Sequence, residues 1–291
     1  MKKVFKPLAM ACACLLPFSA LAIEKGAVDE FPIGITMATP TAFMPPPGVY
    51  LIVKPTISGG DSIDDDGDKT GGRVTSWASN FQAMWVHDST FLGGSWASFI
   101  RNIGIVDVRV RLPTGKTLVG KGLPDTEIVP ASVSWNLGNG FYANAGFGIY
   151  VPDGKYHSQV AIGQNHWAYE PDFSLGYMDK DWIFNAHAVI DINGTNEDTH
   201  YRNGTLLDVD YMAFHRTGAF AYGLVGYYYR QISSDHGPQY LNAGRPEAFS
   251  AGPGFSYRTG RLSLVLDVTK DLYARNIARK GMITTAISYR L

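Results

Sequence analysis

Apolar and polar residues alternate one by one through many segments of this chain. In 182–192, Trp182 and Phe184 fall on one face, whereas Asn185 and Asp191 fall on the other. The same period of two residues recurs at 141–151, 166–177, 206–214 and 262–271. Successive side chains of a β-strand point to opposite faces, so the pattern predicts strands with one apolar and one polar face.

The connections between the predicted strands alternate between short and long. The short ones are turns at 87–89, 137–140, 179–181, 216–218 and 258–260. The long, polar ones lie at 59–74, 111–126, 152–164, 194–204 and 234–246, with a shorter one at 275–281. Outer-membrane barrels have short periplasmic turns and longer extracellular loops, whereas a soluble sandwich has no reason to sort its connections. The chain is therefore predicted to be an all-β, transmembrane, antiparallel up-and-down β-barrel of the outer-membrane type.

We expect about twelve strands, an even number that leaves both ends of the barrel in the periplasm. They are predicted at 48–58, 75–86, 90–110, 127–136, 141–151, 165–178, 182–193, 205–215, 220–233, 247–258, 261–274 and 282–291. The third strand changes phase between Phe99 and Asp107, which indicates a β-bulge. The ninth is ambiguous because tyrosines occupy 227–229 on both faces. The last strand alternates up to Leu291, where barrels commonly have an aromatic residue.

Residues 1–22 have the features of a cleavable signal peptide. Three lysines precede an apolar run at 8–16, and Ala20-Leu21-Ala22 predicts cleavage after Ala22. The apolar run is too short to span a bilayer as a helix. Both cysteines of the chain, Cys12 and Cys14, lie in this segment, so no disulfide is expected in the barrel at 48–291.

Segment 23–47 is rich in proline and has no clean period. Proline is excluded from the interior of a strand ladder. Apolar residues such as Phe31, Met37 and Phe43 favour a packed segment. Two interpretations remain open for this segment: a disordered leader, or a partial plug that enters the lumen from the periplasm.

Several function classes find no support in the sequence. A net charge of −1 does not favour a nucleic-acid surface. The chain has no phosphate-binding glycine loop and no histidine spacing typical of a metal site, so we expect no metal or cofactor. The acidic run at 61–68 lacks the glycine that a calcium loop needs at its sixth position, and it is interpreted as a solvated loop.

The polar faces of the predicted strands supply the candidate site residues. These candidates for the lumen and substrate path are Lys54, Arg109, Glu170, Asp172, His187, Asp191, Asp208, Asp210, Arg230, Asp267 and Arg290. In one interpretation the acids pair with Lys54, Arg109, Arg230, Arg290 and His187 in a neutralised network that braces the lumen. In the other, the charges form a constriction that selects what passes.

Local motifs along the chain resemble a known family. They are 45–50 (PPPGVY), 150–156 (YVPDGKY), Asn196, Thr199, Tyr201, Arg202 and Gly204, 226–231 (GYYYRQ), Asp235, and 251–253 (AGP). Their order resembles the outer-membrane family linked to the meta pathway of phenol degradation, the SphA-like transporters. The resemblance implies uptake of hydrophobic or aromatic compounds across the outer membrane.

We therefore expect an outer-membrane channel for passive uptake of small hydrophobic or aromatic compounds, with an axial or a lateral route past Pro171 and Pro253. Its expected partners are outer-membrane lipid and lipopolysaccharide, the barrel-assembly machinery and the solute itself. The alternative is a phospholipase-like barrel enzyme or a closed structural barrel. Catalysis is not expected, because no serine can be matched to His166, His187 or His215 as a triad.

Overall fold

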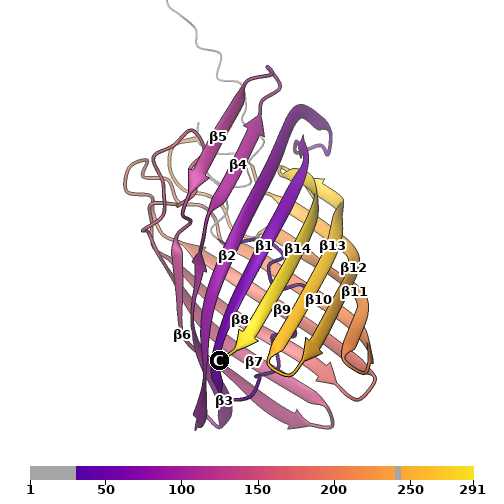
Figure 1. The fold of residues 1–291 in the computed structure, drawn as a ribbon. Helices are drawn as coiled ribbons and strands as arrows, with labels where there is room; N and C mark the ends of the chain where they lie inside the picture. The colour runs from indigo at the N-terminus through magenta and orange to yellow at the C-terminus, as the bar shows by residue number, and fades with distance from the viewer. Residues whose placement is uncertain (1–30, 240–243) are drawn as a thin grey trace, which may run out of the picture.

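The computed structural model describes residues 31–239 and 244–291, and the predicted signal peptide lies outside these ranges. Within them the chain forms one closed antiparallel β-barrel (Figure 1), as predicted. Neighbouring strands follow one another round the wall, and pairing of β1 with β2 closes it. The strands are β1 (Gly48–Ile63), β2 (Lys69–Phe91), β3 (Gly94–Ile103), β4 (Val106–Arg111), β5 (Thr117–Gly122), β6 (Thr126–Gly138), β7 (Phe141–Val151), β8 (Ala168–Met178), β9 (Trp182–Asn193), β10 (Leu206–Thr217), β11 (Phe220–Gln231), β12 (Glu247–Thr259), β13 (Leu262–Arg275) and β14 (Ala278–Arg290).

Twelve of these strands form the wall of the described barrel, because β4 and β5 make a hairpin that continues beyond β3. The chain leaves β3 and enters β4 at residues 104–105, which is where the phase change in the sequence predicts a bulge. Asn102 has a φ of 68°, and the neighbouring Gly104 approaches the backbone of Ser79 too closely for a Cβ atom. Above residues 104–105, β4 pairs with the upper half of β2, and the hairpin projects from the barrel (Figure 1).

Four predicted connections differ from the structure, since 59–74 is strand except at 64–68 and 111–126 contains β5. Residues 87–89 continue β2, and the chain turns instead at Leu92-Gly93, both of which have positive φ. The extended strand is held by Trp96, which stacks on His87 at 3.5 Å. The shorter connection predicted at 275–281 is mostly strand, with a turn between Arg275 and Ala278. The other connections at this end of the barrel include the long loops 152–167, 194–205 and 232–246, whereas β13 and β14 are joined by a short turn.

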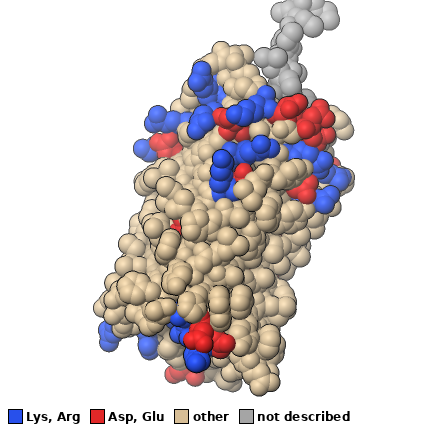
Figure 2. All heavy atoms as spheres, turned by 90° about the vertical axis from the view of Figure 1, so that its right-hand side faces the viewer, with Lys and Arg blue, Asp and Glu red and all other residues tan. Residues whose placement is uncertain are grey.

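The outer surface of the barrel is apolar. Trp182, Phe184 and Ile192 on β9 face outward, whereas Asn185 and Asp191 are buried inside. Figure 2 shows charged side chains gathered at the two ends, with a broad belt between them that is almost free of charge. Aromatic pairs such as Phe141 and Tyr177 lie near the short turns, as in an aromatic girdle. No helix in the described residues is long and apolar enough to cross a membrane.

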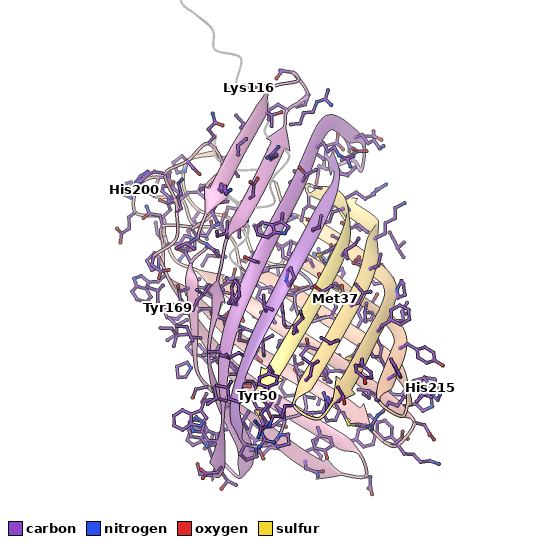
Figure 3. All side chains as sticks on the ribbon, in the orientation of Figure 1. Met37, Tyr50, Lys116, Tyr169, His200 and His215 are labelled. Atoms are coloured by element: carbon purple, nitrogen blue, oxygen red, sulfur yellow. The ribbon has the colours of Figure 1, made fainter. Side chains whose placement is uncertain are left out.

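Residues 31–47 run inside the barrel and fill much of its interior. Met37 and Ala42 are almost fully buried, and Met37 lies in the lumen in Figure 3. Ile33 and Met37 belong to one apolar cluster with Phe214 and Tyr227 of the wall. The ninth predicted strand is thereby resolved: Tyr227 and Tyr229 face this cluster, and Tyr228 faces outward.

Candidate functional site

Two carboxylates of β10 hold the beginning of the lumen segment. Asp208 accepts a hydrogen bond from the backbone N–H of Gly34 at 3.0 Å. Asp210 accepts bonds from both the N–H and the hydroxyl of Thr36, at 2.8 and 2.5 Å. Hydrogen bonds to ionised groups are roughly twice as strong as neutral ones. These carboxylates therefore bind backbone donors of a segment that has no strand partner of its own.

A second set of contacts holds the segment nearer the short turns. Asn185 of β9 accepts a bond from Ala42 N–H at 2.9 Å and donates to the Thr41 hydroxyl at 3.0 Å. Ser134 of β6 donates to the Ala42 carbonyl at 2.7 Å. The hydroxyls of Thr41 and Ser174 lie 2.7 Å apart. All these bonds run from side chains, not from a strand ladder.

Small residues of the segment and the wall allow this close packing. A Cβ atom at Gly176 of β8 would lie 2.7 Å from the Phe43 ring. Gly34 has a φ of 76° and packs against Tyr227, so a side chain there would meet both strain and a clash. The ring of Phe43 contacts that of Tyr142 at 4.7 Å between centroids.

Arg101 of β3 joins two buried carboxylates on neighbouring parts of the wall. Its guanidinium forms ion pairs with Glu127 of β6 and, at 2.7 Å, with Glu170 of β8. Tyr150 of β7 donates to the other oxygen of Glu170 at 3.1 Å. Glu127 and Glu170 have side-chain exposures of 1% and 0%. Buried charges of this kind are stable only when paired and hydrogen-bonded.

Arg101 and Glu127 were not among the candidates from sequence. Arg101 lies next to the bulge, where the predicted face of the third strand is uncertain, and Glu127 is the first residue of its predicted strand. Their pairing spans 26 residues, and that of Arg101 with Glu170 spans 69. The sequence signal for this cluster would have been three inward-facing charged residues, Arg101, Glu127 and Glu170, at the same height in the barrel.

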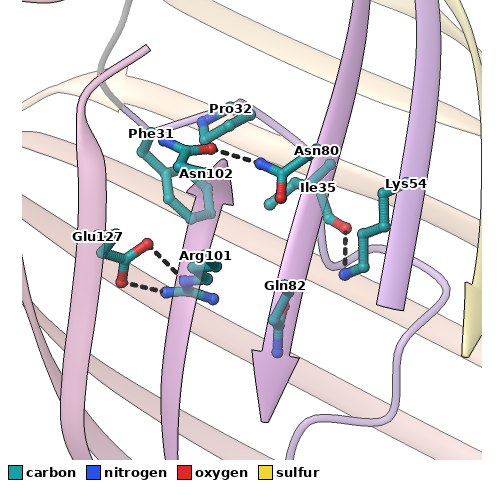
Figure 4. A pocket seen from close by; sticks show the side chains of 9 residues that line it. All are labelled: Phe31, Pro32, Ile35, Lys54, Asn80, Gln82, Arg101, Asn102 and Glu127. Carbon is teal, nitrogen blue, oxygen red and sulfur yellow. Dashed lines mark hydrogen bonds and ion pairs between the residues drawn. The ribbon is translucent and has the colours of Figure 1, made fainter. Parts of the chain in front are cut away.

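A small cavity lies between the start of the segment and the wall (Figure 4). Lys54 closes one side of it and donates to the Ile35 carbonyl at 3.2 Å. Its lining residues are Phe31, Pro32, Ile35, Lys54, Asn80, Gln82, Arg101, Asn102 and Glu127. The cavity has space for about one water molecule, so a larger solute needs the segment to move.

Most predicted site residues face the lumen, but two do not. Lys54, Glu170, Asp172, His187, Asp191, Asp208, Asp210 and Asp267 lie on inward faces of the wall. Arg290 lies at the inner rim and donates to the Pro47 carbonyl at 2.5 Å. Arg109 and Arg230 instead face outward, with side-chain exposures of 65% and 51%. The predicted partnership of these two arginines with the lumen acids is therefore wrong, since β4 leaves the wall and Arg230 pairs with Glu247.

Thr36, His187 and Asp172 are aligned like a nucleophile, a base and an orienting acid. Thr36 Oγ1 lies 2.9 Å from His187 Nδ1, and His187 Nε2 lies 3.1 Å from Asp172. The Thr36 hydroxyl donates its single proton to Asp210, however, so it has none to donate to His187. Because an activated nucleophile must instead donate to its base, this arrangement favours attachment of the segment over catalysis.

The long-loop end of the barrel is folded and held by two aspartates. Asp125 accepts from Gly154 N–H and Gln164 N–H, both at 2.6 Å. Asp235 accepts from the Tyr201 hydroxyl and from Gly204 N–H, at 2.8 and 2.7 Å. Several motif residues of the predicted resemblance therefore have a clear structural role: they fix the loops over the mouth of the barrel.

The wall strands keep their register at Pro171 and Pro253, although ladder pairing is interrupted at each proline. Pairing of β8 with β9 resumes in the same register on both sides of Pro171, from Tyr169 with Ile192 to Asp172 with Val189. The same holds for β12 and β13 around Pro253. The register of the wall is therefore unchanged across both prolines.

Comparison with known proteins places these features in context. Residues 54–290 match the model of a family described as putative MetA-pathway of phenol degradation. An outer membrane channel from Pseudomonas putida F1 has the same fold, with a TM-score of 0.75 and 13% identity over 87% of this chain and 98% of that one.

More distant similarities are found to other barrels. The NanC porin has a TM-score of 0.48 and 11% identity, over 83% of this chain and 100% of its own. The translocator domain of the autotransporter NalP from Neisseria meningitidis also has a TM-score of 0.48, with 10% identity over 85% and 90% of the two chains. No curated protein sequence matches this chain.

Proposed function

We propose that this chain, which belongs to the family described as putative MetA-pathway of phenol degradation, is an outer-membrane channel for passive uptake of small hydrophobic or aromatic compounds. The apolar belt and the likeness to an outer-membrane channel support a place in the outer membrane. The signal peptide would direct export and be cleaved after Ala22, and the barrel-assembly machinery would insert the barrel into the outer membrane. The aromatic substrate class is supported by the family description.

The way in which residues 31–47 are attached carries this proposal. The segment fills the lumen but is bound there by side-chain hydrogen bonds from Asp208, Asp210 and Asn185. A structural barrel could close its interior permanently with its own wall side chains, as barrels of about eight strands do. A separate segment held by replaceable bonds instead suits a partial plug that moves aside.

Movement of the segment would expose a lumen with both polar and aromatic contacts. Asp208, Asp210 and Asn185 would lose their backbone partners and become available to water or to a polar group of a solute. Tyr227 and Tyr142, which contact Gly34 and Phe43 of the segment, would offer ring faces. Binding sites for small ligands combine largely apolar walls with a few placed polar groups in this way.

Selective flux can be measured in proteoliposomes with the purified barrel. We compare swelling rates in phenyl β-glucoside and methyl β-glucoside, which share a sugar that limits leakage through the bilayer. A nonselective pore passes the smaller methyl compound faster. An aromatic-selective channel is expected to pass the larger phenyl compound at least as fast, because its ring is stabilised by aromatic contacts in the lumen.

Two controls accompany this measurement. Liposomes without protein correct for leakage, and a porin of larger bore gives the order expected from size alone. Faster passage of the methyl compound through our barrel would contradict aromatic selectivity, and no flux of either solute would contradict the channel itself.

A further inference from the structure

A row of charged residues crosses the outer surface of the barrel above the apolar belt. Arg279 of β14 is the cross-strand partner of Asp61 of β1, which in turn partners Arg73 of β2. Arg73 is then the partner of Arg111 of β4. Neighbouring strands are about 4.8 Å apart, so this row spans roughly 14 Å across the wall. It lies at the end that carries the long loops, which is the extracellular end of an outer-membrane barrel.

The next row toward the membrane has two cations with small residues between them. Lys270 of β13 partners Gly281, which partners Gly59, and Thr75 partners both Gly59 and Arg109. Because Gly281 and Gly59 have no side chains, the outer surface between Lys270 and Arg109 is a shallow depression. A further row down, Trp77, Ile57 and Ile283 are exposed and apolar. Asp107 of β4, the cross-strand partner of Trp77, ends this row and pairs with Arg109 at 3.5 Å. The cations therefore border the apolar belt directly, at the level expected for lipid headgroups.

Three of these cations have no anionic partner in residues 31–239 and 244–291. Arg73 and Lys69 both pair with Asp61, at 2.9 and 2.7 Å, and so neutralise it. Lys270, Arg279 and Arg111 form no ion pair within the described ranges. The Nε atom of Arg279 is also buried without a hydrogen-bond partner there. Unpaired cations grouped on one face indicate an anionic ligand from outside the chain.

We propose that this face, formed by Lys270, Arg279, Arg73, Arg111 and Arg109, binds the phosphate groups of a phosphorylated glycolipid of the outer leaflet, of the lipid A type. Arginine forks match phosphate oxygens with paired N–H donors, and Lys270 adds a point charge. The acyl chains of the same lipid lie against Trp77, Ile57 and Ile283 below. The cations thus lie at the height of the lipid phosphates, and the apolar residues lie below them at the height of the acyl chains.

Binding of labelled diphosphoryl lipid A to the purified barrel in detergent tests this assignment. The K270Q/R279Q variant removes two of the unpaired cations without breaking an ion pair between described residues. We expect its affinity to be weaker than that of the wild type by about tenfold or more, because each basic residue near a charged lipid surface contributes appreciably to binding. R111Q, in the β4–β5 hairpin, is expected to weaken binding in the same direction.

The matched control is K180Q/R261Q, which removes two exposed cations from turns at the opposite end. Its affinity is expected to stay within about twofold of the wild type. Heat-dependent mobility on gels confirms that every variant is folded. Equal binding by the wild type and K270Q/R279Q, or equal binding of dephosphorylated lipid A, would overturn the proposal. Displacement of the lipid by millimolar inorganic phosphate would overturn it too, because it would identify a site for free anions.

Discussion

Oxidation of a T41C/S174C variant is expected to close the barrel to solutes, and reduction is expected to open it again. The hydroxyl oxygens of Thr41 and Ser174 lie 2.7 Å apart, one on the lumen segment and one on β8. Cysteine sulfur atoms placed there can approach to bonding distance with small movements of the side chains. A disulfide would fix residues 31–47 in the lumen, and the population with an open lumen would be lost.

Single-channel conductance and glucoside flux measure this effect. We expect oxidised channels to conduct at least about tenfold less than the same channels after reduction, because a covalent bond replaces a set of exchangeable hydrogen bonds. The background is favourable, because the chain has two cysteines, both within the predicted signal peptide.

The single variants T41C and S174C are the matched controls. Each loses the same native hydroxyl contact but cannot form the tether, so neither should respond to oxidant. Equal flux through oxidised and reduced T41C/S174C, with the disulfide verified by mass, would show that solutes pass while the segment stays in place. That result would contradict the partial plug but would leave a channel possible along another route.

The wall could be predicted closely where the alternation is regular. The predicted ranges 141–151 and 182–193 coincide with β7 and β9, because each strand has an apolar lipid face and a polar lumen face along its length. Prediction failed at 87–89, where His-Asp-Ser looks like a turn. There the side-chain stacking of Trp96 on His87 extends the hairpin to Leu92-Gly93. Such cross-strand contacts depend on register, which local composition does not show.

The lumen site was predicted only in part, for a related reason. The carboxylates of Asp208 and Asp210 could be placed inside from alternation, but their partners could not. Sequence suggested arginines and lysines as partners, whereas the structure gives them backbone N–H groups 174 residues away in a segment without periodicity. The sequence of a proline-rich segment reveals its apolar residues. It does not reveal which wall side chains accept hydrogen bonds from the backbone N–H groups of the segment.

Replacement of Arg101 by methionine is expected to destabilise the barrel strongly. The guanidinium is the shared partner of Glu127 and Glu170, whose side chains are almost entirely buried. Methionine keeps much of the side-chain volume but leaves two carboxylates close together without their cation. Removing one partner of a buried ion pair typically costs about 3–5 kcal/mol of unfolding free energy.

Denaturant unfolding of the barrel in lipid vesicles, followed by tryptophan fluorescence, measures this loss. The triple variant R101M/E127Q/E170Q separates charge from packing. It removes all three charges while keeping similar shapes, and the amide carbonyl that E170Q introduces can still accept a bond from Tyr150. We expect it to recover most of the stability lost in R101M, since replacing a whole buried ion-pair network by neutral groups is often close to neutral.

The conservative variant R101K separates the charge of Arg101 from the geometry of its guanidinium. Lysine supplies the charge, but its single ammonium lacks the planar fork that bonds both Glu127 and Glu170. Its stability should therefore fall between those of R101M and the wild type. If R101M, R101K and the triple variant all unfolded at the wild-type denaturant concentration, the carboxylates would have to be solvated by water, and the interior at this level would be wet even with the segment in place.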